Sequence, residues 1–331
     1  MTKTKIAVTL GDPAGIGPEI VVKTFAKEKL HEDSDLVLVG DRFVVEKALK
    51  VTNLDLKINE INDVDEGRYE ACVINLINLD IIKKDYEFGV VDEKCGLAAF
   101  KYIMKAGELA MNKKVESVAT APINKEALKA ANVPFIGHTE MFEEISKVND
   151  PLTMFEVENL RVFFLSRHLS LKDAIDKVKK DRVLDYIKRC TEALRVLGVE
   201  GTLAIAGLNP HCGEHGLFGY EEVNEIVPAI KEAKKQGYDV CGPIGADSIF
   251  HLGLEGRFAA VLSLYHDQGH IATKTYNFMK TISLTNSMPF LRTSVDHGTA
   301  FDVAGKNIAS EISMVEAVRL AAKYGYRFRK E

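Results

Sequence analysis

Three histidines that each follow a predicted strand are the residues best suited to chemistry in this chain: His168, His211 and His266. Imidazole is the commonest protein metal ligand near neutral pH. Because open α/β sheets place their chemistry just beyond the strand ends, histidines far apart in sequence can meet at one sheet edge. We therefore predict a three-histidine metal site. The apolar runs that precede the three residues are Val162 to Leu165, Leu203 to Ala206 and Phe258 to Leu264.

The segment from Gly207 to Gly219 is predicted to be a functional loop, since it is rich in glycine and polar residues at a strand end. It holds His211 and also His215, four residues further on. Its glycines argue against a helix that would pair the two rings. We predict that His211 is the metal ligand and that His215 supports a ligand without binding the metal itself. Cys212 is an alternative soft ligand.

Two shorter segments each allow a functional and a structural interpretation. Gly137-His138-Thr139-Glu140 precedes a predicted helix and suits a phosphate or hydroxyl group, but Thr139 with Glu143 also nearly fits a capping box. In the segment 242–248, Asp247 is a candidate general base or substrate contact. Its alternative role is the N-cap of a helix over 248–253.

Two longer segments are the remaining candidates for a functional role. The segment 9–19 is glycine-rich and leads into a helix whose amides could hold an anion, but a tight turn explains its glycines equally well. Its spacing is not that of a Rossmann fingerprint. The segment 289–306 contains Arg292, whose planar guanidinium group can bind a carboxylate or phosphate through two hydrogen bonds. It also contains Asp302, which could accept hydrogen bonds from a ribose diol and so favour NAD over NADP.

The elements that must position these residues alternate between strands and helices. This order predicts an α/β fold with a mostly parallel sheet covered on both faces. A chain of 331 residues exceeds the usual single core, so two domains are expected. The predicted strands are 5–10, 35–39, 117–120, 202–207, 258–264 and 281–284, and the predicted helices are 18–30, 41–50, 93–111, 124–131, 170–196 with a break near 181, 221–236 and 312–324.

The amino-acid composition limits the kinds of partner that we expect for this protein. The net charge of −5 gives no reason to expect nucleic acid or an anionic membrane. No apolar run approaches the length that spans a bilayer, and the first ten residues are expected to be a strand rather than a secretion signal. The five cysteines have no paired spacing and are expected to be reduced thiols of a cytoplasmic protein.

These segments together resemble the 4-hydroxythreonine-4-phosphate dehydrogenase family. The most specific are Gly207-Leu208-Asn209-Pro210-His211 and Tyr265-His266-Asp267-Gln268-Gly269. A looser similarity to isopropylmalate and isocitrate dehydrogenases lies in Gly15 to Glu19 and in His297 to Lys306. The resemblance implies a two-domain isocitrate/isopropylmalate dehydrogenase-like fold, with the active site in the interdomain cleft. The terminal domain would be 1–128 plus 275–331 and contact NAD, and the central domain would be 129–274.

The resemblance also implies a homodimer with shared active sites and one divalent metal ion per site, held by the three histidines named above. Zinc is expected, with cobalt, nickel, manganese or magnesium as alternatives. NAD would be contacted at Gly298 and Asp302, and the proton acceptor would be Asp247 or Asp267. A family asparagine falls where this chain has Ser283, and nearby Asn286 could replace it. The implied substrate-binding residues are His138, Thr139, Lys274, Ser283 and Arg292.

The segments 269–275 and 281–289 depart from the founding members. They resemble the paralogous 4-phospho-D-threonate and 4-phospho-D-erythronate 3-dehydrogenases instead. We expect oxidation of a phosphorylated hydroxy acid at C3, then decarboxylation to dihydroxyacetone phosphate and CO2. The nearest alternative is the dehydrogenase of pyridoxal phosphate biosynthesis, acting on 4-phosphohydroxy-L-threonine. More distant alternatives are a phosphate-ester metallohydrolase and a non-catalytic metabolite sensor.

Overall fold

The computed structural model describes residues 3–329, and its backbone divides into two compact units. The first comprises residues 1–151 and 287–331, and the second comprises residues 152–286. The expected boundaries were 128/129 and 274/275. The observed ones lie further along the chain because the helices that follow residue 124 pack on the first unit's longest helix, and because the strand after residue 281 pairs inside the second unit.

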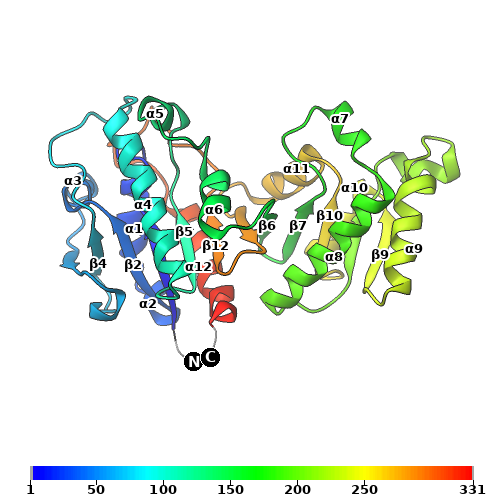
Figure 1. Cartoon of the computed structure of the whole chain (residues 1–331), viewed down its shortest axis with the longest axis horizontal. Helices are drawn as coiled ribbons and strands as arrows, with labels where there is room; N and C mark the ends of the chain where they lie inside the picture. Colours follow the sequence, from blue (N-terminus) through cyan, green and yellow to red (C-terminus); the bar gives the residue numbers. More distant parts are fainter. Residues whose placement is uncertain (1–2, 330–331) are drawn as a thin grey trace. The chain divides into compact units, whose positions relative to one another are not determined.

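The first unit is built on parallel strands in the order β3-β4-β2-β1-β5-β12. Every residue of β5 and β12 is buried, as expected for strands covered on both faces. Helices α1 and α12 pack together, while α4 crosses from β4 to β5 (Figure 1). The strands are β1 Thr4–Thr9, β2 Ser34–Gly40, β3 Lys57–Glu60, β4 Val73–Asn78, β5 Ser117–Thr120 and β12 Leu291–Ser294.

Helices of the first unit begin and end largely where the sequence predicts. Asn124 caps α5 through a bond from the Ala127 amide to its side chain, as expected. The helix expected over 18–30 ends early, and a short second helix follows it. The helices are α1 Gly17–Phe25, α2 Leu30–Asp33, α3 Arg42–Thr52, η1 Val64–Glu66, α4 Glu93–Met111, α5 Lys125–Ala130, α6 His138–Ser146, α12 Ile312–Gly325 and η4 Tyr326–Phe328.

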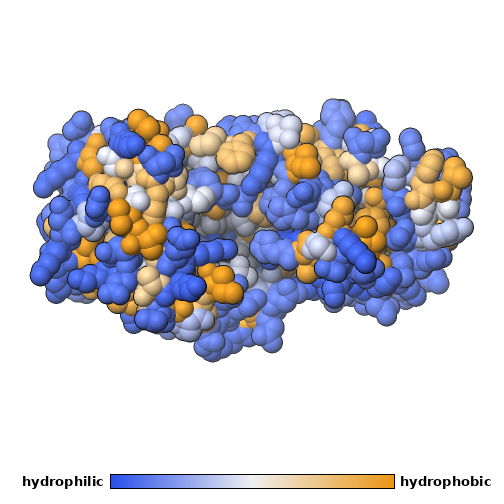
Figure 2. All heavy atoms as spheres, turned by 90° about the horizontal axis from the view of Figure 1, so that it is seen from above, coloured by the Kyte–Doolittle hydropathy of each residue, from blue (hydrophilic) through white to orange (hydrophobic). Residues whose placement is uncertain are grey.

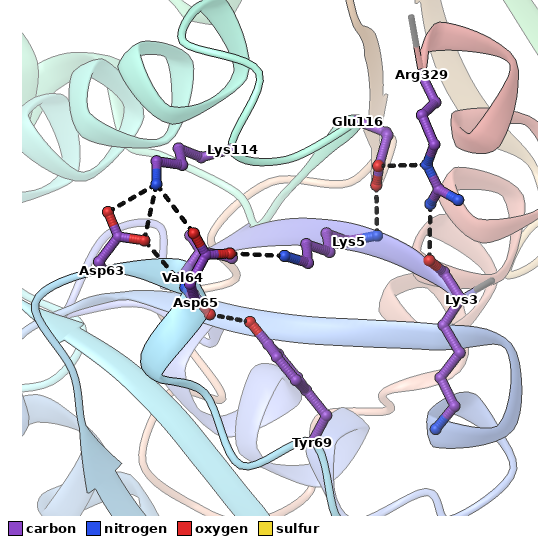
Figure 3. Close-up of polar contacts among 9 residues, drawn as sticks. All are labelled: Lys3, Lys5, Asp63, Val64, Asp65, Tyr69, Lys114, Glu116 and Arg329. Atoms are coloured by element: carbon purple, nitrogen blue, oxygen red, sulfur yellow. Dashed lines mark hydrogen bonds and ion pairs between the residues drawn. The ribbon is translucent and has the colours of Figure 1, made fainter. Parts of the chain in front are cut away.

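An ionic network ties three parts of the first unit together (Figure 3). Lys5 of β1 and Lys114, just before β5, both bind the Asp65 carboxylate of η1, at 2.9 and 3.1 Å. Hydrogen bonds from the two ammonium groups lower the pKa of Asp65 to about 2. On the other side, Glu116 accepts from the Lys5 amide at 2.6 Å and from Arg329 at 2.8 Å. The network thereby joins η1, β1 and the last described residues of the chain.

The second unit has a mixed sheet in the order β11-β6-β7-β10-β8-β9. Strands β7, β10, β8 and β9 are parallel neighbours, whereas β6 is antiparallel to both β11 and β7. The prediction of a mostly parallel α/β fold is therefore confirmed, and the antiparallel pairing of β6 was not predicted. The strands are β6 Leu152–Val157, β7 Leu160–Phe164, β8 Leu203–Ala206, β9 Val240–Ile244, β10 Ala260–Ser263 and β11 Ile282–Asn286.

Helices α8 and α9 of the second unit pack against one another, and α10 and α11 both contact β7 and β10 (Figure 1). The long helix expected over 170–196 is two helices, and the break lies at residues 177–179, where the sequence predicted it near 181. The helix expected over 221–236 begins with one π-helical turn. The helices are α7 Leu171–Asp176, α8 Lys180–Leu197, η2 Pro210–Gly216, η3 Glu222–Ile226, α9 Val227–Lys235, α10 Ala246–Leu254 and α11 His266–Asn277.

The surface has both hydrophobic and hydrophilic regions. Figure 2 shows hydrophobic side chains at several separate places, each bordered by hydrophilic ones. Within residues 3–329, no helix has the length and apolarity needed to span a membrane.

Candidate functional site

The three strand-end histidines follow three neighbouring strands of the second unit. His168 comes after β7, His266 begins α11 directly after β10, and His211 comes after β8. Strand β10 pairs in parallel with β7 on one side and β8 on the other. The topology confirms the premise of the prediction, because the carboxyl ends of adjacent parallel strands lie at one sheet edge. Neighbouring strands are about 4.8 Å apart.

Buried hydrogen bonds hold these strand ends together. Ser166, after β7, donates its hydroxyl to the carbonyl of Leu264, after β10, at 2.9 Å. Gln268 of α11 accepts from the Leu264 amide at 2.7 Å and donates to the Gly207 carbonyl, after β8, at 2.8 Å. The first turn of α11 is therefore fixed to both neighbouring strand ends.

His168 and His266 line one pocket of about 330 Å³, with their ring centroids 6.1 Å apart. The Nδ1 atom of His266 lies 2.6 Å from the Asp267 carboxylate. A carboxylate partner on Nδ1 leaves Nε2 free to bind a cation, an arrangement found behind metal-ligating histidines. The donor chemistry of this pair therefore fits a divalent metal ion. The other lining residues are Arg167, Leu169, Leu171, Ala174, Tyr265 and Asp267.

His211 does not line that pocket. It is exposed, and its ring centroid lies 6.3 Å from that of Phe218. Among residues 3–329, no three His, Cys, Asp or Glu side chains are gathered closely enough to hold a metal ion. The structure thus brings two of the predicted ligands together, and the three-histidine site stays a prediction. His215 is also exposed, four residues further along the same segment.

The backbone around His211 is unusual. Residues His211–His215, which we call the left-handed turn, have φ values of 51°, 56°, 77°, 44° and 59°. Within it, burial and the charges of Glu222 and Asp247 raise the pKa of the Cys212 thiol.

His270 is a further member of this site and was not among the predicted functional residues. It lies one helical turn after His266, with the two ring centroids 4.1 Å apart, and it packs against Phe155 and Phe164. Burial, followed by the positive charges of nearby groups, lowers the pKa of His270 to about 3. Its imidazole is therefore neutral. The signal available in the sequence was the i, i+4 spacing of the two histidines on one helix.

Asp247 is exposed on the first turn of α10. The helix begins at Ala246 with Gly245 as its N-cap, so the alternative of Asp247 as a cap for 248–253 is wrong. Its carboxylate accepts from the Ser248 hydroxyl at 3.1 Å. Because the Asp267 carboxylate already contacts His266, the Asp247 carboxylate is the more available of the two candidate bases.

A second group of predicted residues lies in the first unit, around Arg292. This arginine is 6 % exposed, and its Nε and Nη2 donate to the Thr120 hydroxyl at 3.2 and 3.0 Å. Its guanidinium carbon lies 5.3 Å from the Phe142 ring centroid. Burial, and then the charge of Arg292, hold the pKa of His138 well below its usual range. A neutral imidazole and a fixed cation are therefore paired, which suits an anionic group with hydroxyls.

Thr139 lies in the first turn of α6, half-buried. The N-cap of α6 is Gly137, and no side chain caps it, so the capping-box alternative for Thr139 and Glu143 is wrong. Glycine at this position leaves the amides at the start of the helix available to an anion.

The remaining predicted substrate residues lie in the second unit. Lys274 is in α11, with its ammonium 5.3 Å from the Phe278 ring centroid. Ser283 is in β11, opposite Phe155 of β6, and is half-buried. Asn286, its suggested substitute, is 2 % exposed, and its Nδ2 has no hydrogen-bond partner within the described part of the chain.

The predicted NAD contacts lie in the first unit on a loop that packs against the start of α1. Gly298 is exposed, and a Cβ added there would meet no atom within 4 Å. Asp302 is also exposed. A Cβ on Gly15, in contrast, would lie 2.8 Å from the Thr299 side chain. Close packing thus explains this glycine, and NAD contact at Gly298 and Asp302 stays a prediction.

Comparison with known proteins places this chain among closely similar sequences. A family model described as pyridoxal phosphate biosynthetic protein PdxA matches residues 32–321. A protein of Fusobacterium nucleatum, named "Putative D-threonate 4-phosphate dehydrogenase", is 62 % identical over 99 % of both chains. Among solved structures, a 4-hydroxythreonine-4-phosphate dehydrogenase from Klebsiella pneumoniae has a TM-score of 0.91 at 35 % identity over 98 % of both chains. One from Burkholderia phymatum has a TM-score of 0.88 at 38 % identity over 98 % of this chain and 99 % of the other.

Proposed function

Because this chain belongs to the PdxA family, we propose that it is an NAD-dependent dehydrogenase of 4-phospho-D-threonate or 4-phospho-D-erythronate. The observation that carries this proposal is the 62 % identity, over nearly all of both chains, to a protein named for D-threonate 4-phosphate. The solved 4-hydroxythreonine-4-phosphate dehydrogenases are only 35–38 % identical. The family description and those titles favour the dehydrogenase of pyridoxal phosphate biosynthesis as the second candidate.

The proposed reaction has two stages. The C3 hydroxyl of the substrate loses its proton to a base, and hydride passes from C3 to NAD, which yields a 3-keto acid and NADH. The bond between C1 and C2 then breaks with release of CO2, and protonation of C2 gives dihydroxyacetone phosphate. A divalent metal ion bound to the substrate would lower the pKa of the alcohol and stabilise negative charge on its oxygen.

The residues of the second unit suit the proton and metal roles. His168, His211 and His266 would hold the cation, with Asp267 orienting His266 through its 2.6 Å contact. We assign the proton acceptor to Asp247, since its exposed carboxylate is not engaged with an imidazole. The tyrosine, leucine and alanine side chains of the pocket would limit the access of water.

The residues of the first unit suit the anionic ends of the substrate and the cofactor. Arg292 is buried and held by Thr120, so its orientation is fixed before a ligand arrives. The neutral imidazole of His138 and the amides at the start of α6 can donate to phosphate oxygens. Asp302 and Gly298 would receive the ribose end of NAD. We further propose a homodimer whose active sites are shared between subunits.

An NADH absorbance assay tests this proposal. Purified protein is incubated with NAD and a panel of phosphorylated four-carbon acids that includes 4-phosphohydroxy-L-threonine, with and without a chelator. We expect the greatest kcat/KM with a 2,3-dihydroxy acid, release of one CO2 for each NADH, and loss of the rate with chelator. A preference for the 2-amino substrate would establish the second candidate instead. Phosphate release without NADH would indicate a hydrolase.

A further inference from the structure

The left-handed turn that carries His211 adopts a conformation that its sequence does not favour. Four of its five residues are not glycine, yet all five have φ between 44° and 77°. In L-residues this conformation brings Cβ too close to the following carbonyl oxygen, so consecutive residues rarely adopt it. A backbone of this kind persists only where the surrounding structure fixes it, and it is concentrated at functional sites.

The Glu222 carboxylate holds the residues that lead into this turn. It is 1 % exposed and accepts three hydrogen bonds. Its Oε1 accepts from the amides of Leu208 and Asn209 at 2.8 and 2.7 Å, and its Oε2 accepts from the Asn209 side chain at 2.8 Å. The neighbouring Glu221 accepts from the same Asn209 nitrogen at 2.7 Å. Three donors compensate the burial of the charge, so the carboxylate fixes both the backbone and the side chain before the turn.

Two glycines show how closely the turn and Glu222 are packed. A Cβ on Gly213, inside the turn, would lie 2.8 Å from the Glu222 Oε2 atom. A Cβ on Gly219 would lie 2.4 Å from the Asn209 side-chain nitrogen. Both glycines have positive φ. The turn is therefore fitted around this carboxylate and its amide partner.

The other side of the segment is fixed to the element that carries His266. Gln268 of α11 donates to the carbonyl of Gly207, the residue just before Leu208. Gly207 is thus hydrogen-bonded to α11, and Leu208 and Asn209 are hydrogen-bonded to η3. His211 is the second residue after Asn209, the last residue that these hydrogen bonds hold, and it begins the left-handed turn.

We propose that Glu222 is a positioning residue for metal binding, which acts by holding the left-handed turn so that His211 can join His168 and His266 as a ligand. This inference depends on the proposed function, because it takes the cation at this sheet edge as given. Glu222 itself does not touch the cation. The role assigned to it is to fix the backbone conformation of the left-handed turn that carries the third predicted ligand.

Cobalt(II) binding to the purified full chain tests this inference. Affinity is measured by equilibrium dialysis, and ligand geometry by the visible absorption of bound Co²⁺. We expect Glu222→Gln to lower the affinity about 10-fold, because the carboxamide NH2 would face the Asn209 NH2, and Glu222→Ala to lower it about 100-fold. The matched control is Glu225→Gln, on the same π-helical turn. Glu225 accepts from the Lys180 amide and pairs with Lys179, away from the left-handed turn, so we expect unchanged affinity.

A double variant separates positioning from general destabilisation. If Glu222 acts through His211, adding Glu222→Ala to His211→Ala should lower the Co²⁺ affinity no further. An equal further loss in the His211→Ala background would overturn the proposal, as would unchanged affinity in both Glu222 variants. If the unaltered protein binds no Co²⁺ and forms no NADH, the proposed function fails and this inference fails with it. Turnover and Co²⁺ binding in the unaltered protein, together with unchanged Glu222 variants, reject this inference alone.

Discussion

Glu19, in the first helix of the chain, accepts a hydrogen bond from the amide of Ala309, 290 residues further on, at 3.0 Å. Its second oxygen accepts from the Asn307 amide at 3.3 Å. Lys23, one turn later in α1, binds the Glu19 carboxylate and the Ala309 carbonyl, both at 2.8 Å. The Glu19 side chain is 4 % exposed. The motif at the start of the chain therefore holds the loop that carries the predicted NAD contacts.

Glu19→Ala should weaken the first unit and its use of NAD. The change leaves the ammonium of Lys23 half-buried without its carboxylate, which typically costs about 3 kcal/mol. We expect a lower melting temperature and a higher KM for NAD, with a smaller effect on the KM of the phosphorylated acid. Glu46→Gln, which breaks an exposed pair with Arg42, is the control and should change neither quantity. Equal increases in both KM values would contradict a role confined to the NAD loop.

Removal of the predicted metal ligands should abolish turnover with little change in fold. His168→Ala and His266→Ala each remove one imidazole from a solvent-accessible pocket, so the packed core is unaffected. Asp267→Asn should weaken metal binding by about 10- to 100-fold, because the partner that orients His266 is altered. Metal content after dialysis and the NADH rate measure these effects.

His251→Gln is the matched control for these variants, since His251 is an exposed histidine on α10 that pairs with Glu255. It should retain both metal and activity. Full NADH production by His168→Ala in chelator-treated buffer would refute the metal role.

Local patterns predicted several elements with the observed bounds. Helix α4 and strand β5 begin and end where the sequence indicates, because a long amphipathic helix and a short buried strand have clear periodicity and boundaries. The antiparallel pair of β6 and β7 was not predicted. Every residue of β6 is buried, so it lacks the polar alternation that marks most antiparallel strands. Strand β3 was missed for the opposite reason, since it is a polar strand at the sheet edge.

The sequence predicted where the histidines of the candidate site lie relative to the strands, but not the backbone conformation around them. The strand-end positions of His168, His211 and His266 follow from the order of elements, which the sequence carries. The left-handed turn does not follow from it, because its conformation depends on a carboxylate that lies beyond the turn in the chain. Local sequence preferences contain no signal for a backbone that a tertiary contact imposes.

Arg292→Lys should impair substrate binding more than the fold. Lysine keeps the charge but loses the planar fork that binds Thr120 and stacks near Phe142. Loss of a charge-assisted hydrogen bond is worth about 1.5–3 kcal/mol, so we expect the KM for the phosphorylated acid to rise about 10- to 100-fold. Arg319→Lys, which alters an arginine on α12 paired with Glu316, is the control and should leave KM unchanged. An unaltered KM in Arg292→Lys would exclude Arg292 from the substrate site.

Asp12→Asn should remove a pH dependence of stability from the first unit. Asp12 is fully buried, and burial, with a smaller effect of Asp92, raises its pKa from 3.8 to about 6. The folded state therefore favours the protonated acid. Its contribution to stability is complete below pH 3.8 and is lost as pH rises to 6, by about 3 kcal/mol at 1.36 kcal/mol for each pH unit.

Asparagine retains an oxygen for the Ala14 amide, which now binds Oδ1 at 2.9 Å, and it carries no charge at any pH. We expect the variant to match the parent near pH 4 and to have the higher melting temperature at pH 7.5. The exposed variant Asp80→Asn should shift neither curve, because that carboxylate lies on the surface beside Lys83. Melting curves of Asp12→Asn and the parent that stay parallel from pH 4 to pH 7.5 would show that Asp12 is ionised throughout this range in the folded protein.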